Sequence, residues 1–99
     1  MMVSKYAMPR WIFIDVDGTL IKKDETLNQY LIDWCRKMKT EDYNLVLWSS
    51  RGMEHAKHAA ETAGMLDVFD HIISKPGMIV DDTEWAWINF VPALDVWRD

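Results

Sequence analysis

The chain has 99 residues, 49% of them hydrophobic, and a net charge of −5, which suits one domain with its own core. The negative charge argues against broad binding to nucleic-acid backbones. A single cysteine, Cys35, excludes an internal disulfide framework, and no apolar stretch is long enough to cross a membrane. Residues 1–10 lack the apolar centre of a secretion signal. We therefore expect one domain over residues 1–99, with a flexible tail over 1–10, in a reducing, cytoplasmic setting.

The first apolar run, Trp11–Ile14, predicts a buried strand that ends in two carboxylates, Asp15 and Asp17. Side chains two positions apart on a strand share one face, so these two acids are expected to lie together. Gly18 indicates that the backbone turns there, through a conformation that other residues avoid. Two crowded acids repel each other unless a cation lies between them, and a hard divalent ion such as Mg²⁺ is the usual solution.

The motif has two other interpretations. The simpler one is a strand followed by an Asp-Gly turn with solvated acids. The other is a calcium-binding loop, which the spacing contradicts: counting from Asp15, the sixth position is Leu20 instead of glycine, and the twelfth is Thr26 instead of glutamate.

The next element is a predicted helix that starts near Thr26, since Thr26 and Gln29 have the spacing of a capping box. An apolar stripe at helical period follows, formed by Leu27, Tyr30, Leu31, Trp34 and Met38. Cys35 lies on this apolar face, which favours a small core residue over a nucleophile.

A second helix is predicted over Met53–Ala63, with Gly64 as its C-terminal cap. His55 and His58 lie three positions apart on it and suggest a zinc-binding face, although a solvated polar face is the simpler interpretation. A third helix is predicted to open at Thr83 and to stop before Pro92. Most of the six Trp residues are expected to pack in the core or between helices, although stacking on a base or sugar is an alternative.

Three more apolar runs predict strands, and each is followed at once by polar residues. The runs are Leu45–Trp48, Ile72–Ile73 and Met78–Val80, and the residues that follow them are Ser49-Ser50-Arg51, Ser74-Lys75 and Asp81-Asp82. Parallel strands need helical crossovers, and ligands bind at their carboxyl ends. We therefore predict a small three-layer, Rossmann-like α/β fold, with an open, mainly parallel sheet and helices on both faces. Its carboxyl edge would gather Asp15, Asp17, Ser49 and Asp81 or Asp82.

One spacing conflicts with this scheme, because only six positions separate Lys75 from Asp81. Parallel neighbours cannot be joined by so short a link. Either Ile72–Ile73 is not a true parallel strand, or Lys75 does not reach the site, in which case Lys22, Lys23 or Arg51 would supply its positive charge.

Taken together, the motifs resemble the haloacid dehalogenase superfamily of phosphatases and phosphotransferases, from Trp11 to about Asp82. The first motif is Asp15, Asp17, Gly18 and Thr19, and the second is Ser49 with Ser50 and Arg51. The third is Lys75, and the fourth is the pair Asp81-Asp82.

The resemblance implies a phosphomonoester hydrolase that works through an aspartyl-phosphate. Asp15 would be the nucleophile and Asp17 the general acid and base, while Ser49 and Lys75 would stabilise the phosphoryl group. Substrate binding would involve Gly18, Thr19, Ser50 and Arg51. Mg²⁺ would be held by a side-chain oxygen of Asp15, the backbone carbonyl of Asp17 and one acid of the pair Asp81-Asp82.

Relatives of this kind often carry a cap domain, and here the sequence leaves room only for a short flap at 20–24. The resemblance therefore implies an open site for a large phosphorylated substrate, such as a nucleic-acid end or a phosphoprotein, or a site covered by another subunit in a homo-oligomer. Two alternatives stay open: a phosphate- or Mg²⁺-binding module without turnover, and a phosphotransferase.

Overall fold

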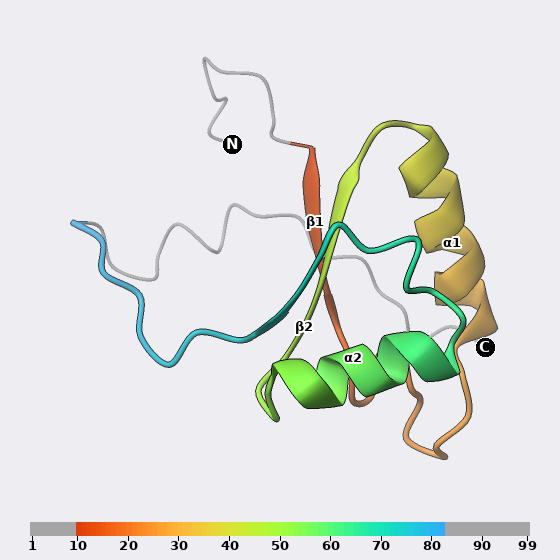
Figure 1. Ribbon diagram of the computed structural model, residues 1–99, viewed down its shortest axis with the longest axis horizontal. Coiled ribbons are helices and arrows are strands. Elements are labelled where there is room, and N and C mark those ends of the chain that lie inside the picture. The colour runs from red at the N-terminus through yellow and green to blue at the C-terminus, as the bar shows by residue number, and fades with distance from the viewer. Residues whose placement is uncertain (1–9, 83–99) are drawn as a thin grey trace, which may run out of the picture.

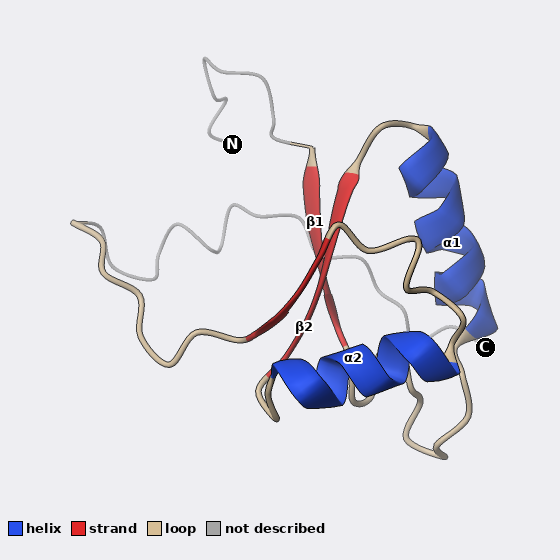
Figure 2. Ribbon diagram, in the orientation of Figure 1, coloured by secondary structure: helices blue, strands red, loops and turns tan. Residues whose placement is uncertain are grey.

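A computed structural model describes residues 10–82 as three parallel strands and two helices (Figures 1 and 2). In chain order the elements are β1 (Trp11–Asp15), α1 (Gln29–Thr40), β2 (Asn44–Ser49), α2 (Met53–Thr62) and β3 (His71–Ser74). The strand order is β1-β2-β3, with β2 in the middle. The predicted α/β class with a parallel sheet is therefore confirmed.

The register of the strands brings their carboxyl ends to one edge of the sheet. Asp15, the last residue of β1, pairs with Trp48, and Ser49, the last residue of β2, pairs with Ser74. The turns that follow the three strands consequently begin at nearly the same level. This edge is where the sequence placed its candidate site.

The first helix begins later than the capping-box pattern predicted. It starts at Gln29, and the side chain of Asn28 accepts a hydrogen bond from the backbone N–H of Leu31 at 3.1 Å. Thr26 instead donates its hydroxyl to the carboxylate of Asp24. A buried Asn28 satisfies an N–H of the first helical turn better than an exposed Thr26 that is already engaged in a turn. The second helix matches its prediction closely, with Gly64 just beyond its end.

The described core lies on one face of the sheet, against which both helices pack. Ile14, Leu45 and Leu47 of the strands form one cluster with residues of the helices, among them Leu31, Ile32 and Cys35 of α1 and Ala56, Ala59 and Ala60 of α2. The alanines let α2 lie close to the sheet. Within residues 10–82, then, the helices cover a single face, whereas the sequence predicted helices on both.

The opposite face of the sheet carries aromatic side chains. Strand alternation places Trp11 and Phe13 of β1 on this face, and both are about half exposed. The ring of Trp11 stacks on His71 with centroids 5.7 Å apart, and Phe13 lies against Trp48 with centroids 4.7 Å apart. Of the three described Trp residues, only Trp34 packs against the main core.

The predicted strand Met78–Val80 is wrong. Residues 75–82 run away from the sheet without regular structure (Figure 1), and Val80 is 91% exposed. The physical reason is the short link between Lys75 and Asp81. Ile72 and Ile73 are part of β3, and too few residues follow them for a crossover to another parallel strand. The predicted tail over residues 1–9 and the helix predicted from Thr83 lie outside the described residues.

Neither described helix is long and apolar enough to span a bilayer.

Candidate functional site

The turn after β1 presents Asp15 and Asp17 at the carboxyl edge of the sheet. Gly18 has φ of +79°, the conformation expected from the sequence. The backbone N–H groups of Thr19 and Ile21 both donate to the carbonyl of Val16, at 3.1 and 3.0 Å. Val16 is completely buried, which anchors the turn in the core. Both carboxylates that flank Val16 therefore remain accessible at a fixed backbone position.

A short hairpin follows this turn and is the only insertion between β1 and α1. Ile21 and Leu27 form an antiparallel bridge, and the N–H of Lys22 donates to the carbonyl of Thr26 at 2.8 Å. It is a small flap, as the sequence predicted, and it has no core of its own. On the other side of the site, residues 50–70 contain α2 and connecting turns.

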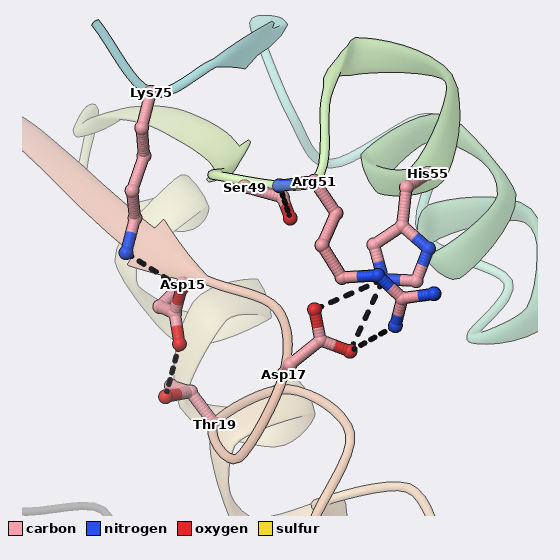
Figure 3. A network of polar contacts seen from close by, with 7 residues as sticks. All are labelled: Asp15, Asp17, Thr19, Ser49, Arg51, His55 and Lys75. Carbon is pink, nitrogen blue, oxygen red and sulfur yellow. Dashed lines mark hydrogen bonds and ion pairs between the residues drawn. The ribbon is translucent and has the colours of Figure 1, made fainter. Parts of the chain in front are cut away.

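Asp15 contacts two side chains that come from different parts of the chain (Figure 3). The Nζ atom of Lys75 lies 2.8 Å from its Oδ1, and the hydroxyl of Thr19 donates to its Oδ2 at 3.1 Å. Lys75 directly follows β3, and its backbone N–H donates to the carbonyl of Ser49 at 3.0 Å. Since β3 is a true parallel strand, the conflict in the sequence is resolved: Lys75 reaches this edge.

Asp17 is held by two other side chains, from α2 and from the turn before it. The Nε2 atom of His55 lies 3.1 Å from Oδ1 and 3.0 Å from Oδ2 of Asp17, and Nη1 of Arg51 lies 3.4 Å from Oδ1 (Figure 3). The sequence predicted Arg51 at the site. For His55 it suggested a zinc-binding face shared with His58, or simply a solvated polar face. The signal that could have found His55 is topological, since the first turn of α2 follows β2 at the carboxyl edge of the sheet.

Ser49 is almost completely buried at the end of β2, with 1% of its surface exposed. Its Oγ accepts a hydrogen bond from the N–H of Arg51 at 3.0 Å, which leaves the hydroxyl proton available for donation. Gly52 lies at φ of +107° and leads the chain into α2. Ser50, which the sequence also nominated, is exposed on this turn.

The acids predicted to bind Mg²⁺ are not all brought together. Asp81 and Asp82 are exposed on the segment that leads away from the sheet, because the strand that was to position them does not form. Across residues 10–82, no three His, Cys, Asp or Glu side chains are close enough to hold a metal ion. Mg²⁺ in proteins often takes only one or two carboxylates and completes its shell with water and phosphate oxygens, so the carboxylate of Asp15 and the backbone carbonyl of Asp17 remain its candidate ligands.

The charges at this edge are of both signs. The two carboxylates face Lys75 and Arg51, with the imidazole of His55 beside them. These side chains are only partly buried, so a ligand can approach them from solvent. A doubly negative phosphoryl group could replace one carboxylate as the partner of Lys75 or Arg51.

Cys35 takes no part in this site. It is fully buried in the core, and burial raises the pKa of its thiol to about 12. The reactive thiolate is therefore suppressed at neutral pH. The sequence interpretation of Cys35 as a core residue is confirmed.

A model of the haloacid dehalogenase-like hydrolases matches residues 12–92, so it spans the strand-end motifs described above. No curated protein matches the chain. No solved structure matches it either.

Proposed function

Because this chain belongs to the haloacid dehalogenase-like hydrolase family, we propose that it hydrolyses phosphate monoesters at the carboxyl edge of its sheet. The family supports a hydrolase in general. The observation that favours phosphate chemistry is the pairing of each carboxylate with its own cationic partner: Asp15 with Lys75, and Asp17 with Arg51.

The proposed reaction has two steps. In the first, a carboxylate oxygen of Asp15 bonds to phosphorus and the bond to the leaving oxygen breaks, while Asp17 in its acid form gives its proton to that oxygen. In the second, Asp17 takes a proton from a water molecule that attacks phosphorus. The bond between Asp15 and phosphorus then breaks, which releases phosphate and restores the carboxylate of Asp15.

The neighbouring side chains would stabilise the charge of the transferred group. Lys75 is the proposed partner of the phosphoryl oxygens once Asp15 has begun its attack, and the hydroxyl of Ser49 would donate to one of them. Arg51 is 65% exposed as a side chain, so it can turn from Asp17 to an incoming substrate. Preorganised positive charge and hydrogen-bond donors of this kind provide much of the catalysis of phosphoryl transfer.

Mg²⁺ is the proposed cofactor, and the carboxylate of Asp15 and the backbone carbonyl of Asp17 are the groups of this chain that would hold it. When bound, the ion would offset the negative charge of the two carboxylates and the phosphate. Asp81 and Asp82 are left out of this proposal, since they lie away from the pair. Thr19 would keep one oxygen of Asp15 oriented by its hydrogen bond.

The proposed substrate is large enough to cover the site itself. Within residues 10–82, the segment inserted beside the carboxylates is only a short hairpin, so a small molecule would stay exposed to water there. A phosphorylated macromolecule, or a second subunit placed over the edge, would supply the missing cover. Transfer of the phosphoryl group to an acceptor other than water would use the same residues.

The test is turnover by purified protein with Mg²⁺ on a panel of phosphorylated sugars, nucleotides, oligonucleotides with 3′- or 5′-phosphates, and phosphopeptides. Asp15→Asn is expected to abolish activity on every substrate while the melting temperature is retained. Asp33→Asn, which changes an exposed acid of α1, serves as the matched control and is expected to keep full activity. Retention of more than a few percent of activity by Asp15→Asn would overturn the covalent route.

A further inference from the structure

We propose that His55 is a positioning residue, which holds the carboxyl group of Asp17 in the orientation needed for proton transfer. The inference rests on the proposed hydrolysis, and it adds a residue that the motifs of the sequence do not contain. Its basis is the contact of one imidazole nitrogen with both oxygens of Asp17, at 3.1 and 3.0 Å.

The two oxygens of Asp17 indicate that Nε2 of His55 is the donor in this contact. Two carboxylate oxygens lie beside Nε2 of His55, and an imidazole nitrogen without hydrogen would turn its lone pair toward theirs. Nε2 therefore carries the hydrogen and donates it to Asp17. This donation persists when Asp17 is protonated, because the N–H can bond to one oxygen while the other oxygen carries the proton destined for the leaving group.

His55 is the more rigid of the two side chains that hold Asp17. It lies in the first turn of α2, where its neighbour Ala56 is fully buried, and its own side chain is 24% exposed. Arg51 is 65% exposed, has more rotatable bonds and makes a longer contact of 3.4 Å. The orientation of the Asp17 carboxyl group thus depends mainly on the docking of α2 against the sheet.

The carboxylates of Asp15 and Asp17 point toward different partners. In Figure 3, Asp15 points toward Lys75 and Thr19, whereas Asp17 points toward Arg51 and His55. Without His55, the half-exposed carboxyl group of Asp17 would rotate among several orientations. A proton donor that is in place for only part of the time loses much of the rate advantage of proximity.

A comparison of two leaving groups distinguishes a role of His55 in proton transfer from a merely structural role. A good leaving group such as p-nitrophenolate needs little proton transfer, whereas an alkoxide leaves only with a proton. We expect His55→Ala to lower kcat/KM about 30-fold on an alkyl phosphate, a part of the roughly 100- to 10,000-fold contribution of general acid catalysis, and less than about 3-fold on p-nitrophenyl phosphate. The constant kcat/KM reports the first step, whereas kcat also contains the second step, in which Asp17 takes a proton from water whichever group has left. Asp17→Asn should show the same order of effects on kcat/KM, with a larger loss.

His58→Ala is the matched control, because His58 lies one turn further along the same helix and is exposed. It is expected to leave both activities unchanged. His55→Gln should recover part of the loss on the alkyl phosphate, since the amide can donate to the same carboxyl group. A crystal structure of His55→Ala should show Asp17 in more than one rotamer, a result that does not depend on activity.

An equal loss of kcat/KM on both substrates in His55→Ala, or no loss on either, would overturn the role of His55. Where His55→Ala fails to fold, His55→Leu, which keeps the bulk of the side chain but has no donor, decides by the same criterion. If the wild-type protein cleaves no phosphate monoester, or if Asp17→Asn shows no dependence on the leaving group, the proposed function itself fails. A single ordered rotamer of Asp17 in His55→Ala would contradict the positioning role in either case.

Discussion

The Nζ atom of Lys75 lies 2.8 Å from Oδ1 of Asp15, although β2 lies between β1, which ends at Asp15, and β3, which precedes Lys75. The lysine side chain crosses the end of the middle strand and passes 5.8 Å from the centre of the Trp48 ring. Its backbone is fixed there by the hydrogen bond to the carbonyl of Ser49. The positive charge beside the proposed nucleophile is thus a product of strand order and register.

Lys75→Ala is expected to lower turnover on the order of 100-fold, the scale of losing one preorganised charge-stabilising contact. Steady-state kinetics on the best substrate would measure the effect. Lys57→Ala, which removes an exposed lysine of α2, is the control and should change little. A loss below about threefold in Lys75→Ala would direct attention to Lys22, Lys23 and Arg51.

Removal of metal with EDTA is expected to abolish activity, and millimolar Mg²⁺ to restore it. Mg²⁺ should also raise the melting temperature, because an ion that binds only the folded state stabilises that state by mass action. Asp15→Asn should reduce this shift, whereas Asp33→Asn should not. Activity that resists EDTA, combined with no thermal shift, would count against a metal at these carboxylates.

A monomeric protein is expected to prefer a phosphorylated oligonucleotide or peptide over the matching mononucleotide or phosphoamino acid. The reason is that a small hairpin excludes little water, so the remote parts of a larger substrate must supply cover and binding energy. The comparison is kcat/KM on the two substrates, together with the molecular mass in solution. A monomer that is more efficient on the small substrate would refute the expectation, and an oligomer with that preference would indicate cover by a neighbouring subunit.

Asp70 is expected to stabilise the fold in a pH-dependent way. Hydrogen bonds from the Lys39 side chain and the backbone N–H of Leu45 hold its pKa below the ordinary value of 3.8. A depressed pKa means that the stabilisation is present above about pH 4 and is lost as the pH falls through the folded-state value.

Asp70→Asn should therefore lower the melting temperature on the order of 5 °C at pH 7, as expected for a partly exposed charged contact in a small domain. The difference from wild type should shrink toward pH 2. Thermal melts at pH 2, 3, 5 and 7 would measure it, with Asp33→Asn as the control. A difference that stays constant across these pH values would show that the charge of Asp70 is not what stabilises the fold.

The parts of the fold that local pattern controls could be predicted from the sequence. The apolar run before Asp15 gave a strand, the alanine-rich segment before Gly64 gave a helix, and Gly18 turns as expected. These predictions succeeded because each depends on the residues within a few positions. The start of α1 was placed at Thr26, since a capping pattern does not show which side chain is buried.

The rest depended on contacts between distant segments. The pattern of Met78–Val80 is that of a strand, yet strand formation needs a partner that so short a link does not reach. The contact between His55 and Asp17 depends on how α2 lies across the end of β2. No motif in the sequence indicates how α2 is oriented, so the sequence suggested zinc binding for His55 and not a contact with Asp17.

The turns that carry the site limit how the site can diverge. Gly18 at φ of +79° and Gly52 at φ of +107° hold backbone conformations that any side chain would strain. Between them, Ser50 and Arg51 are exposed and have few packing constraints. Selection for a new substrate would therefore act most easily on Ser50, while the two glycines and Arg51 preserve the chemistry, so that recognition can evolve separately from catalysis.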